Sequence, residues 1–139
     1  MKKGQQNLYT LIKKNPGYSQ VPNFIYAIGL SKHALLVLLY LIRCANRKKG
    51  GLCFPSIKNI SNNCSIPSAT TVRKAIQELH DQVLITKKNL GRKNIYKICE
   101  QVYFAIDLAN GKDCNISELK DISPYSDAIE DEDIEYTPI

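Results

Sequence analysis

The longest apolar run of the chain, residues 34–42, lies at the centre of a predicted helix over residues 32–46. Ser31 precedes this helix and is a favourable N-cap, because its hydroxyl can accept a hydrogen bond from a free backbone N–H of the first turn. The helix is apolar on nearly all sides, and such a helix must be buried on most of them. We therefore expect it to form the core of the domain or a dimer interface.

Two shorter helices are predicted on either side of this apolar helix. Pro22 can open the first, since a proline at the first helical position loses no hydrogen bond, and Gly29 can end it. Ser56 can cap the second, which carries Ile57 and Ile60 on one face. The residues before Pro22 are polar and basic, and we expect the start of the chain to be frayed.

A further helix is predicted to follow after a turn through residues 65–67. Ser68 is its expected N-cap, and the helix should run to about residue 82. Its apolar residues are spaced by four, three and four positions, which places them on one helical stripe. These residues are Val72, Ile76, Leu79 and Val83.

Two β-prone runs, residues 84–88 and 94–98, flank a basic, glycine-containing turn and predict a β-hairpin. A buried helix, two helices joined by a tight turn and a basic hairpin describe a winged helix-turn-helix. The predicted fold class is therefore mainly α with a small β-hairpin wing. We divide the chain into a basic N-terminal arm (1–20), the winged helix-turn-helix domain (21–99), a short C-terminal element (100–110) and an acidic tail expected to be disordered (111–139).

Charge is distributed very unevenly along the chain. Residues 1–99 contain 17 Lys and Arg but only two acids, Glu78 and Asp81, whereas residues 100–139 contain two lysines and 11 acids. A domain this basic attracts a polyanion, because neutralising phosphates releases condensed counterions. We expect double-stranded DNA as the partner, and the acidic tail to contact either the basic face of its own chain or another protein.

The helix that follows Ser68 has a second face, opposite its apolar stripe, and this face is free to contact DNA. Arg and Lys side chains can donate to guanine edges, Gln can bond adenine, and a Thr methyl can contact thymine. Hydroxyls near the helix start can donate to phosphates, and the hairpin lysines and arginine can reach an adjacent groove or backbone. The predicted DNA contacts are Ser56, Lys58, Ser68, Thr70, Thr71, Arg73, Lys74, Gln77, Lys87, Lys88, Arg92 and Lys93.

Several segments between residues 21 and 98 resemble the helix-turn-helix domains of bacterial, phage and plasmid DNA-binding proteins, especially those related to plasmid replication initiators and regulators. The segments are VPN (21–23), LS (30–31), RCAN (43–46), CFPSI (53–57) and TVRKAIQEL (71–79). The resemblance implies that Ser56 opens the supporting helix and that Thr71, Arg73 and Lys74 lie in the helix that contacts the bases. Pro67 departs from the pattern as an extra residue in the turn, and Val83 stands where a glycine is common.

Other classes of site have little support in the sequence. Cys44, Cys53 and Cys64 are separated by 9 and 11 residues, whereas structural zinc sites usually supply ligands in close pairs. We expect Cys44 and Cys64 to act as small buried hydrophobic residues. No phosphate-binding glycine motif is present, and neither histidine has an obvious nucleophile beside it. We therefore expect no metal, no cofactor and no enzymatic activity.

The chain shows no apolar run long enough for a membrane span and no signal peptide, and its five cysteines are expected to be reduced thiols in a cytoplasmic protein. The predicted function is a sequence-specific DNA-binding protein, acting as a transcriptional regulator or accessory factor of a bacterial mobile element. A plasmid or phage replication initiation protein is the first alternative. A winged-helix protein-interaction module is the alternative from another class. A homodimer is compatible with each of these functions.

Overall fold

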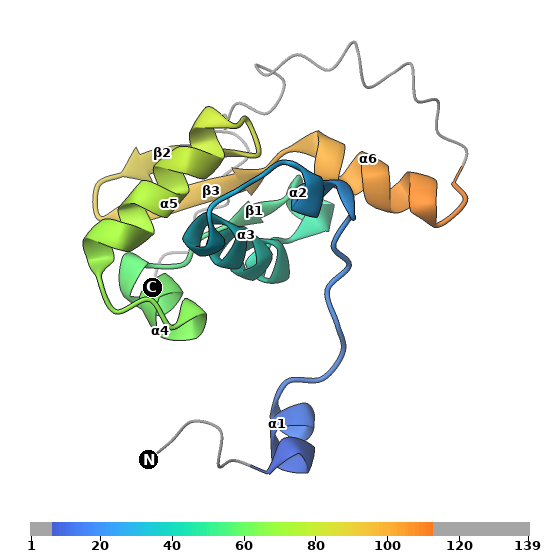
Figure 1. The fold of residues 1–139 in the computed structure, drawn as a ribbon, viewed down its shortest axis with the longest axis horizontal. Coiled ribbons are helices and arrows are strands. Elements are labelled where there is room, and N and C mark those ends of the chain that lie inside the picture. The colour runs from blue at the N-terminus through green and yellow to red at the C-terminus, as the bar shows by residue number, and fades with distance from the viewer. Residues whose placement is uncertain (1–6, 113–139) are drawn as a thin grey trace.

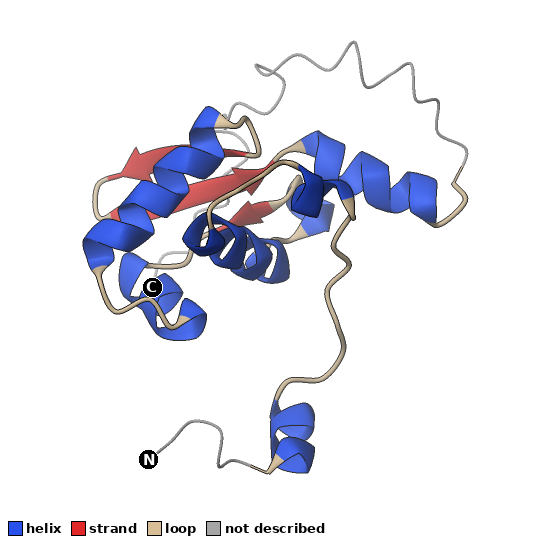
Figure 2. Cartoon of the chain, viewed as in Figure 1, coloured by secondary structure: helices blue, strands red, loops and turns tan. Residues whose placement is uncertain are grey.

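The structure is a computed structural model and describes residues 7–112. Helices α3 and α5 lie across one face of a small antiparallel sheet, while α1 and α6 project from this body (Figures 1 and 2). The elements are α1 (Leu8–Lys14), α2 (Phe24–Ala27), α3 (Lys32–Cys44), the 3₁₀ turn η2 (Arg47–Lys49), β1 (Leu52–Cys53), α4 (Ile57–Cys64), α5 (Ala69–Asp81), β2 (Ile85–Leu90), β3 (Lys93–Ile98) and α6 (Glu100–Ala109). This arrangement confirms the predicted winged helix-turn-helix.

Helix α3 lies at the centre of the core, as its apolar sequence predicts. Val37, Leu38 and Leu41 are fully buried, and the Ser31 hydroxyl accepts a hydrogen bond from the Ala34 N–H at 3.2 Å. The helix ends at Cys44 and not at Asn46, because the Asn46 side chain accepts from the Lys48 N–H at 3.1 Å and caps η2 instead. The chain is thereby turned into the sheet two residues earlier than predicted.

The outer face of α3 is less buried than its sequence suggests. Leu36 is 44% exposed, and Cys44 is exposed at the last position of the helix. The prediction of a buried Cys44 is therefore wrong: Cys44 is the last residue of α3, and the burial of the helix ends with Ile42. Cys64, at the end of α4, is buried as predicted.

The sheet has three antiparallel strands in the order β1-β3-β2, and the hairpin of β2 and β3 is the wing. Strand β1 was not predicted, because two residues carry no detectable alternation. Leu90 pairs with Lys93, so the turn contains only Gly91 and Arg92 and is shorter than the predicted turn over residues 89–93. Gly91 has φ +63°, and a glycine at the first central position is typical of tight two-residue hairpin turns.

Helix α5 buries most of its predicted apolar stripe, but the stripe ends at Leu79 and does not include Val83. Val72, Ile76 and Leu79 are buried, whereas Val83 is 39% exposed and has φ +60°. The prediction that Val83 continues the apolar stripe is wrong because α5 ends at Asp81 and Val83 follows it in the left-handed conformation that closes the helix.

The short C-terminal element is helix α6, which is fastened to the body through a specific contact. Arg47 donates to Asp107, which lowers the pKa of that carboxyl, and its guanidinium lies 5.1 Å from the centre of the Tyr103 ring. Gly51 has φ +83°, and a Cβ on it would lie 2.8 Å from the Tyr103 ring. Only glycine therefore allows this approach of β1 and α6.

The N-terminal arm differs from expectation, whereas the expectations for the acidic tail are not tested. The N-terminal arm contains α1, which was not predicted; Asn7 caps it by accepting from the Tyr9 N–H at 2.8 Å. The acidic tail lies outside the described residues from residue 113 onwards. The expectations of disorder and of contacts for this tail stay predictions.

Candidate nucleic-acid interface

The turn between α4 and α5 fixes how the two helices meet. Ser65 adopts the left-handed conformation with φ 56°, and its N–H donates to the Ser61 carbonyl. Ile66 is 2% exposed and anchors the turn in the core, while the Ser61 hydroxyl donates to the Ile66 carbonyl. Short connections with such internal bonds have little freedom, so α5 projects from the body at a fixed angle.

The two predicted cap residues begin both helices of this unit. The Ser56 hydroxyl accepts from the Asn59 N–H at 3.1 Å, and the Ser68 hydroxyl accepts from the Thr71 N–H at 3.3 Å. Both serines are exposed. A hydroxyl that accepts such a bond still has its own O–H to donate, so each remains able to contact a phosphate.

The outward face of α5 contains the predicted base contacts. Thr70, Arg73, Lys74 and Gln77 are exposed, and Thr71 is half-buried at the side. At 100° per residue, Thr70 and Lys74 lie opposite the buried Val72, in keeping with helical geometry. The structure thus brings these residues together on the one side of α5 that the core does not cover.

Arg73 lies on the side of this face that borders the wing. Burial raises the pKa of the Tyr96 phenol in β3 to about 12, and the nearby Arg73 guanidinium partly opposes this rise. Tyr96 is 2% exposed, and Arg73 is near enough to act electrostatically on its hydroxyl. The exposed Arg73 side chain therefore lies on the part of α5 that is near β3.

Gln77 connects α5 to the wing. Its amide oxygen accepts from Lys87 Nζ at 2.6 Å, and its amide nitrogen donates to the Asp81 carboxylate at 2.8 Å. Reading an adenine edge takes both ends of a glutamine amide. In this structure each end of the amide already has one partner, and the bond to Lys87 holds that ammonium beside α5.

The strand pairing separates the wing residues into two faces. Lys87 pairs with Tyr96, and both lie on the face of the sheet that packs against the core. Lys88 pairs with Ile95 and Lys93 pairs with Leu90, and these residues lie on the opposite face. Arg92 stands at the exposed tip. The structure therefore brings only Lys87 of the predicted hairpin contacts against α5. Lys88 and Lys93 lie on the other face of the wing.

Lys58 is exposed in the first turn of α4. The last turn of α4 is tied to α3, because Asn63 Nδ2 donates to the Tyr40 hydroxyl at 3.3 Å. Lys58 is thus on the helix-turn-helix unit itself, separate from the wing lysines.

The sequence reasoning missed the role of Glu78. The Ser31 backbone N–H and hydroxyl each donate to the Glu78 carboxylate at 2.8 Å, so Glu78 ties the start of α3 to α5. The signal was present, because Glu78 is one of only two acids in residues 1–99, which contain 17 basic residues. The two hydrogen bonds from Ser31 thus engage the Glu78 carboxylate, which lies one helical turn after Lys74.

Other kinds of site receive no support from the part of the chain that the structure describes. Residues 7–112 contain no cluster of three or more His, Cys, Asp or Glu side chains placed to hold a metal ion. None of the described helices has the length and apolarity needed to cross a membrane.

Comparison with known protein families identifies the unit that contains α4 and α5. Residues 29–85 match the model of a helix-turn-helix domain. The match contains α3, α4 and α5 and ends at the first residue of β2. Comparisons with curated proteins and with solved structures give no match.

Proposed function

We propose that the protein binds double-stranded DNA sequence-specifically, with α5 in the major groove and the wing against the neighbouring backbone. The match of residues 29–85 to a helix-turn-helix domain supports this proposal. One observation carries this proposal. The uncovered face of α5 presents Thr70, Arg73 and Lys74, and the acid that follows them, Glu78, is already hydrogen-bonded to Ser31. The major groove of B-DNA is wide enough to admit such a helix.

The residues divide between base contacts and backbone contacts. Arg73 and Lys74 are the proposed donors to guanine edges, and Thr70 is positioned for a thymine methyl. Ser68, at the helix start, is proposed to donate to phosphates. In this assignment Gln77 supports binding indirectly, because it holds the Lys87 ammonium next to α5.

The remaining candidate contacts are proposed to grip the DNA backbone. Ser56 and Lys58 lie at the start of α4, Thr71 flanks α5, and Arg92 stands at the tip of the wing. Lys88 and Lys93 can reach a phosphate only if DNA extends past the wing, since they lie on its outer face. Contacts of this kind position the protein without selecting sequence.

Within DNA binding, we propose a transcriptional regulator or accessory factor of a bacterial mobile element, and no catalytic step. A plasmid or phage replication initiation protein is the second candidate. Residues 1–99 contain 17 basic residues and two acids, which favours a nucleic-acid partner over the function of a protein-interaction module.

Comparing the duplex affinity of the full chain with that of a chain ending at residue 112 tests whether the acidic tail competes with DNA for the basic face.

The proposal predicts a steep salt dependence of binding. If four to eight phosphates are contacted, log K against log salt should fall with a slope of about −4 to −7. The measurement is fluorescence anisotropy with genomic fragments selected by the purified protein and with a random duplex of equal length. A flat response between low and physiological salt would exclude phosphate contacts and favour the alternative, a protein-interaction module.

A further inference from the structure

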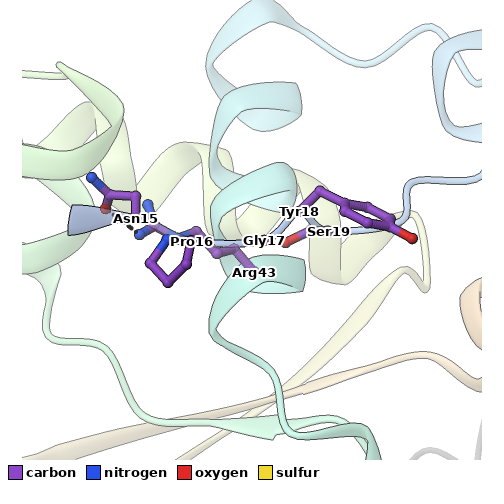
Figure 3. A pocket seen from close by; sticks show the side chains of 6 residues that line it. All are labelled: Asn15, Pro16, Gly17, Tyr18, Ser19 and Arg43. Carbon is purple, nitrogen blue, oxygen red and sulfur yellow. Dashed lines mark hydrogen bonds between the residues drawn. The ribbon is translucent and has the colours of Figure 1, made fainter. Parts of the chain in front are cut away.

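The segment that joins α1 to the body carries a strongly exposed aromatic side chain. Tyr18 is 87% exposed, although a tyrosine ring buries a large apolar area when it has a partner. Figure 3 shows this segment running past Arg43 of α3, with the Tyr18 side chain extending away from Asn15. The Tyr18 ring is therefore open to a partner from outside the chain.

Tyr18 borders a polar depression that we call the Arg43 trough. Two cavities of about 450 and 430 Å³ share Tyr18, Ser19 and Arg43 and therefore adjoin each other. Asn15 lines the first cavity and Arg47 lines the second. No acidic side chain is among the described residues that line either cavity. The trough thus offers guanidinium, amide and hydroxyl groups to an anion.

Arg43 supplies the positive charge of this trough that no described carboxylate neutralises. Its guanidinium donates to the Asn15 side chain at 2.9 Å, and this bond leaves the charge in place because an amide is neutral. Arg47, by contrast, is paired with the Asp107 carboxylate. An anion that enters the trough is therefore attracted chiefly by Arg43.

Two lysines extend the positive charge beyond the trough. Lys13 and Lys14 lie in the last turn of α1, directly before Asn15, and both are exposed. Lys13 Nζ lies 4.8 Å from the centre of the Tyr9 ring, a contact that leaves its charge in place. The first acid of the chain is Glu78, so no carboxylate of the arm competes for these cations.

Cations beside an exposed aromatic ring fit a single strand of nucleic acid better than other polyanions. A positive groove follows the phosphates of a single strand, while its bases stack on the ring. In a duplex each base is already stacked between its neighbours, so Tyr18 would find no free base face along it. An acidic peptide would neutralise Arg43 but would leave the ring without a planar partner.

We propose that the Arg43 trough binds a single-stranded polynucleotide, DNA or RNA, with one base stacked on Tyr18 and the neighbouring phosphates on Arg43 and Lys14. None of these residues belongs to the outward face of α5. The inference therefore goes beyond duplex binding and does not depend on it.

Fluorescence anisotropy of a short labelled oligothymidylate with the full chain tests the stacking contact. Tyr18→Ala should raise the dissociation constant by about tenfold, because it removes the ring on which a base stacks. Tyr18→Phe keeps the ring and should bind as the wild type does. Tyr26→Ala is the matched control, since Tyr26 is 58% exposed on α2 and lines neither cavity. The same titrations with oligouridylate show which backbone binds more tightly, and an effect of Tyr18→Ala with either strand supports the proposal.

Arg43→Gln measures the contribution of charge separately, because glutamine keeps a donor for Asn15 but removes the positive charge. The slope of log K against log salt for oligothymidylate should become less steep by about 0.7, the value for one phosphate contact on a single strand. Tyr18→Ala should leave this slope unchanged, since stacking on a neutral ring releases no counterions.

Arg73→Ala separates the trough from α5. The effect of Tyr18→Ala on oligothymidylate binding should persist in a chain that also carries Arg73→Ala, and Tyr18→Ala alone should leave the affinity for a random duplex unchanged. A chain that binds no duplex would contradict the proposed function, while the oligothymidylate titrations would still decide this inference.

Four results would overturn the proposal. If Tyr18→Ala bound oligothymidylate as tightly as the wild type, or if Tyr26→Ala lost as much affinity, no base would stack specifically on Tyr18. An equal loss for oligothymidylate and for duplex would mean that the trough contacts phosphates of either form. Displacement by thymidine monophosphate at the same concentration as by unlabelled oligothymidylate would mean that the trough holds one nucleotide and not a strand.

Discussion

Helices α5 and α1 each leave one face uncovered, but the two faces have opposite chemistry. Helix α5 has 13 residues, buries Val72, Ala75, Ile76 and Leu79, and leaves a polar, basic face outside. Helix α1 has seven residues, buries none, and leaves its apolar face outside. Exposure alone therefore does not indicate a partner. A basic face fits a polyanion, whereas an apolar face fits another protein surface.

The two helices also differ in what holds them in place. Helix α5 is fixed by core packing, by the Ser31–Glu78 hydrogen bonds and by the Gln77–Lys87 contact to the wing. Helix α1 is fixed by its two asparagine caps and the single Arg43–Asn15 bond. Specific base contacts need a helix held in one orientation. Only α5 meets that requirement.

The largest effect we expect comes from removing the same side chain from each helix. Leu79→Ala should lower the free energy of unfolding by about 2–5 kcal/mol, because Leu79 is fully buried and its loss leaves a cavity. Leu8→Ala should change it by less than about 0.5 kcal/mol, since Leu8 is 75% exposed. Urea denaturation of both variants, at a concentration where the chain is monomeric, measures the difference.

An equal decrease in the free energy of unfolding of the two variants would contradict the comparison of α5 with α1, because Leu8 would then belong to the cooperative core. A small loss for Leu79→Ala would show instead that α5 is not embedded as its burial indicates.

The next effect concerns the division of roles within the DNA-binding surface. Arg73→Ala should weaken binding to a selected cognate site by about 1–3 kcal/mol and binding to a random duplex much less, because a base contact is lost. Lys93→Ala, on the outer face of the wing, should weaken both equally and slightly. Anisotropy titrations of both variants against both duplexes measure these changes. The reverse pattern would mean that the wing selects sequence and α5 grips the backbone.

The features that were predictable from the sequence are those set by local chemistry. Ser31, Ser56 and Ser68 each precede a helical pattern, and each is the N-cap in the structure. The hairpin followed from two β-prone runs around Gly91. Local patterns of this kind need no knowledge of the rest of the chain.

The features that escaped prediction depend on residues far apart in sequence or on weak local signals. Glu78 meets Ser31 across 47 positions, and Gln77 meets Lys87 only because the wing folds back along α5. The exposure of Cys44 depends on what lies beyond the last turn of α3. Helix α1 did have a local signal in Asn7 and the spacing of Leu8 and Ile12, which a basic, polar context obscured.

The smallest effect we expect concerns the ends of α5 and α6, which close in the same way with different residues. At α5, the Val83 N–H bonds the His80 carbonyl and the Leu84 N–H bonds the Leu79 carbonyl; at α6, Gly111 and Lys112 make the corresponding bonds. Both motifs place one residue in the left-handed conformation, with φ 60° at Val83 and 77° at Gly111. Glycine adopts this conformation without strain, whereas a β-branched valine does not.

Replacing Val83 should therefore separate backbone strain from side-chain packing. Val83→Ala removes the side chain but keeps most of the strain, whereas Val83→Gly removes both, so the glycine variant should be more stable than the alanine variant by about 1 kcal/mol. Gly111→Ala should destabilise α6 by a similar amount, because it introduces the strain that Val83 already bears. Thermal or urea unfolding of the three variants measures these differences. A glycine variant less stable than the alanine variant would mean that the added freedom of the unfolded chain outweighs the strain at this junction.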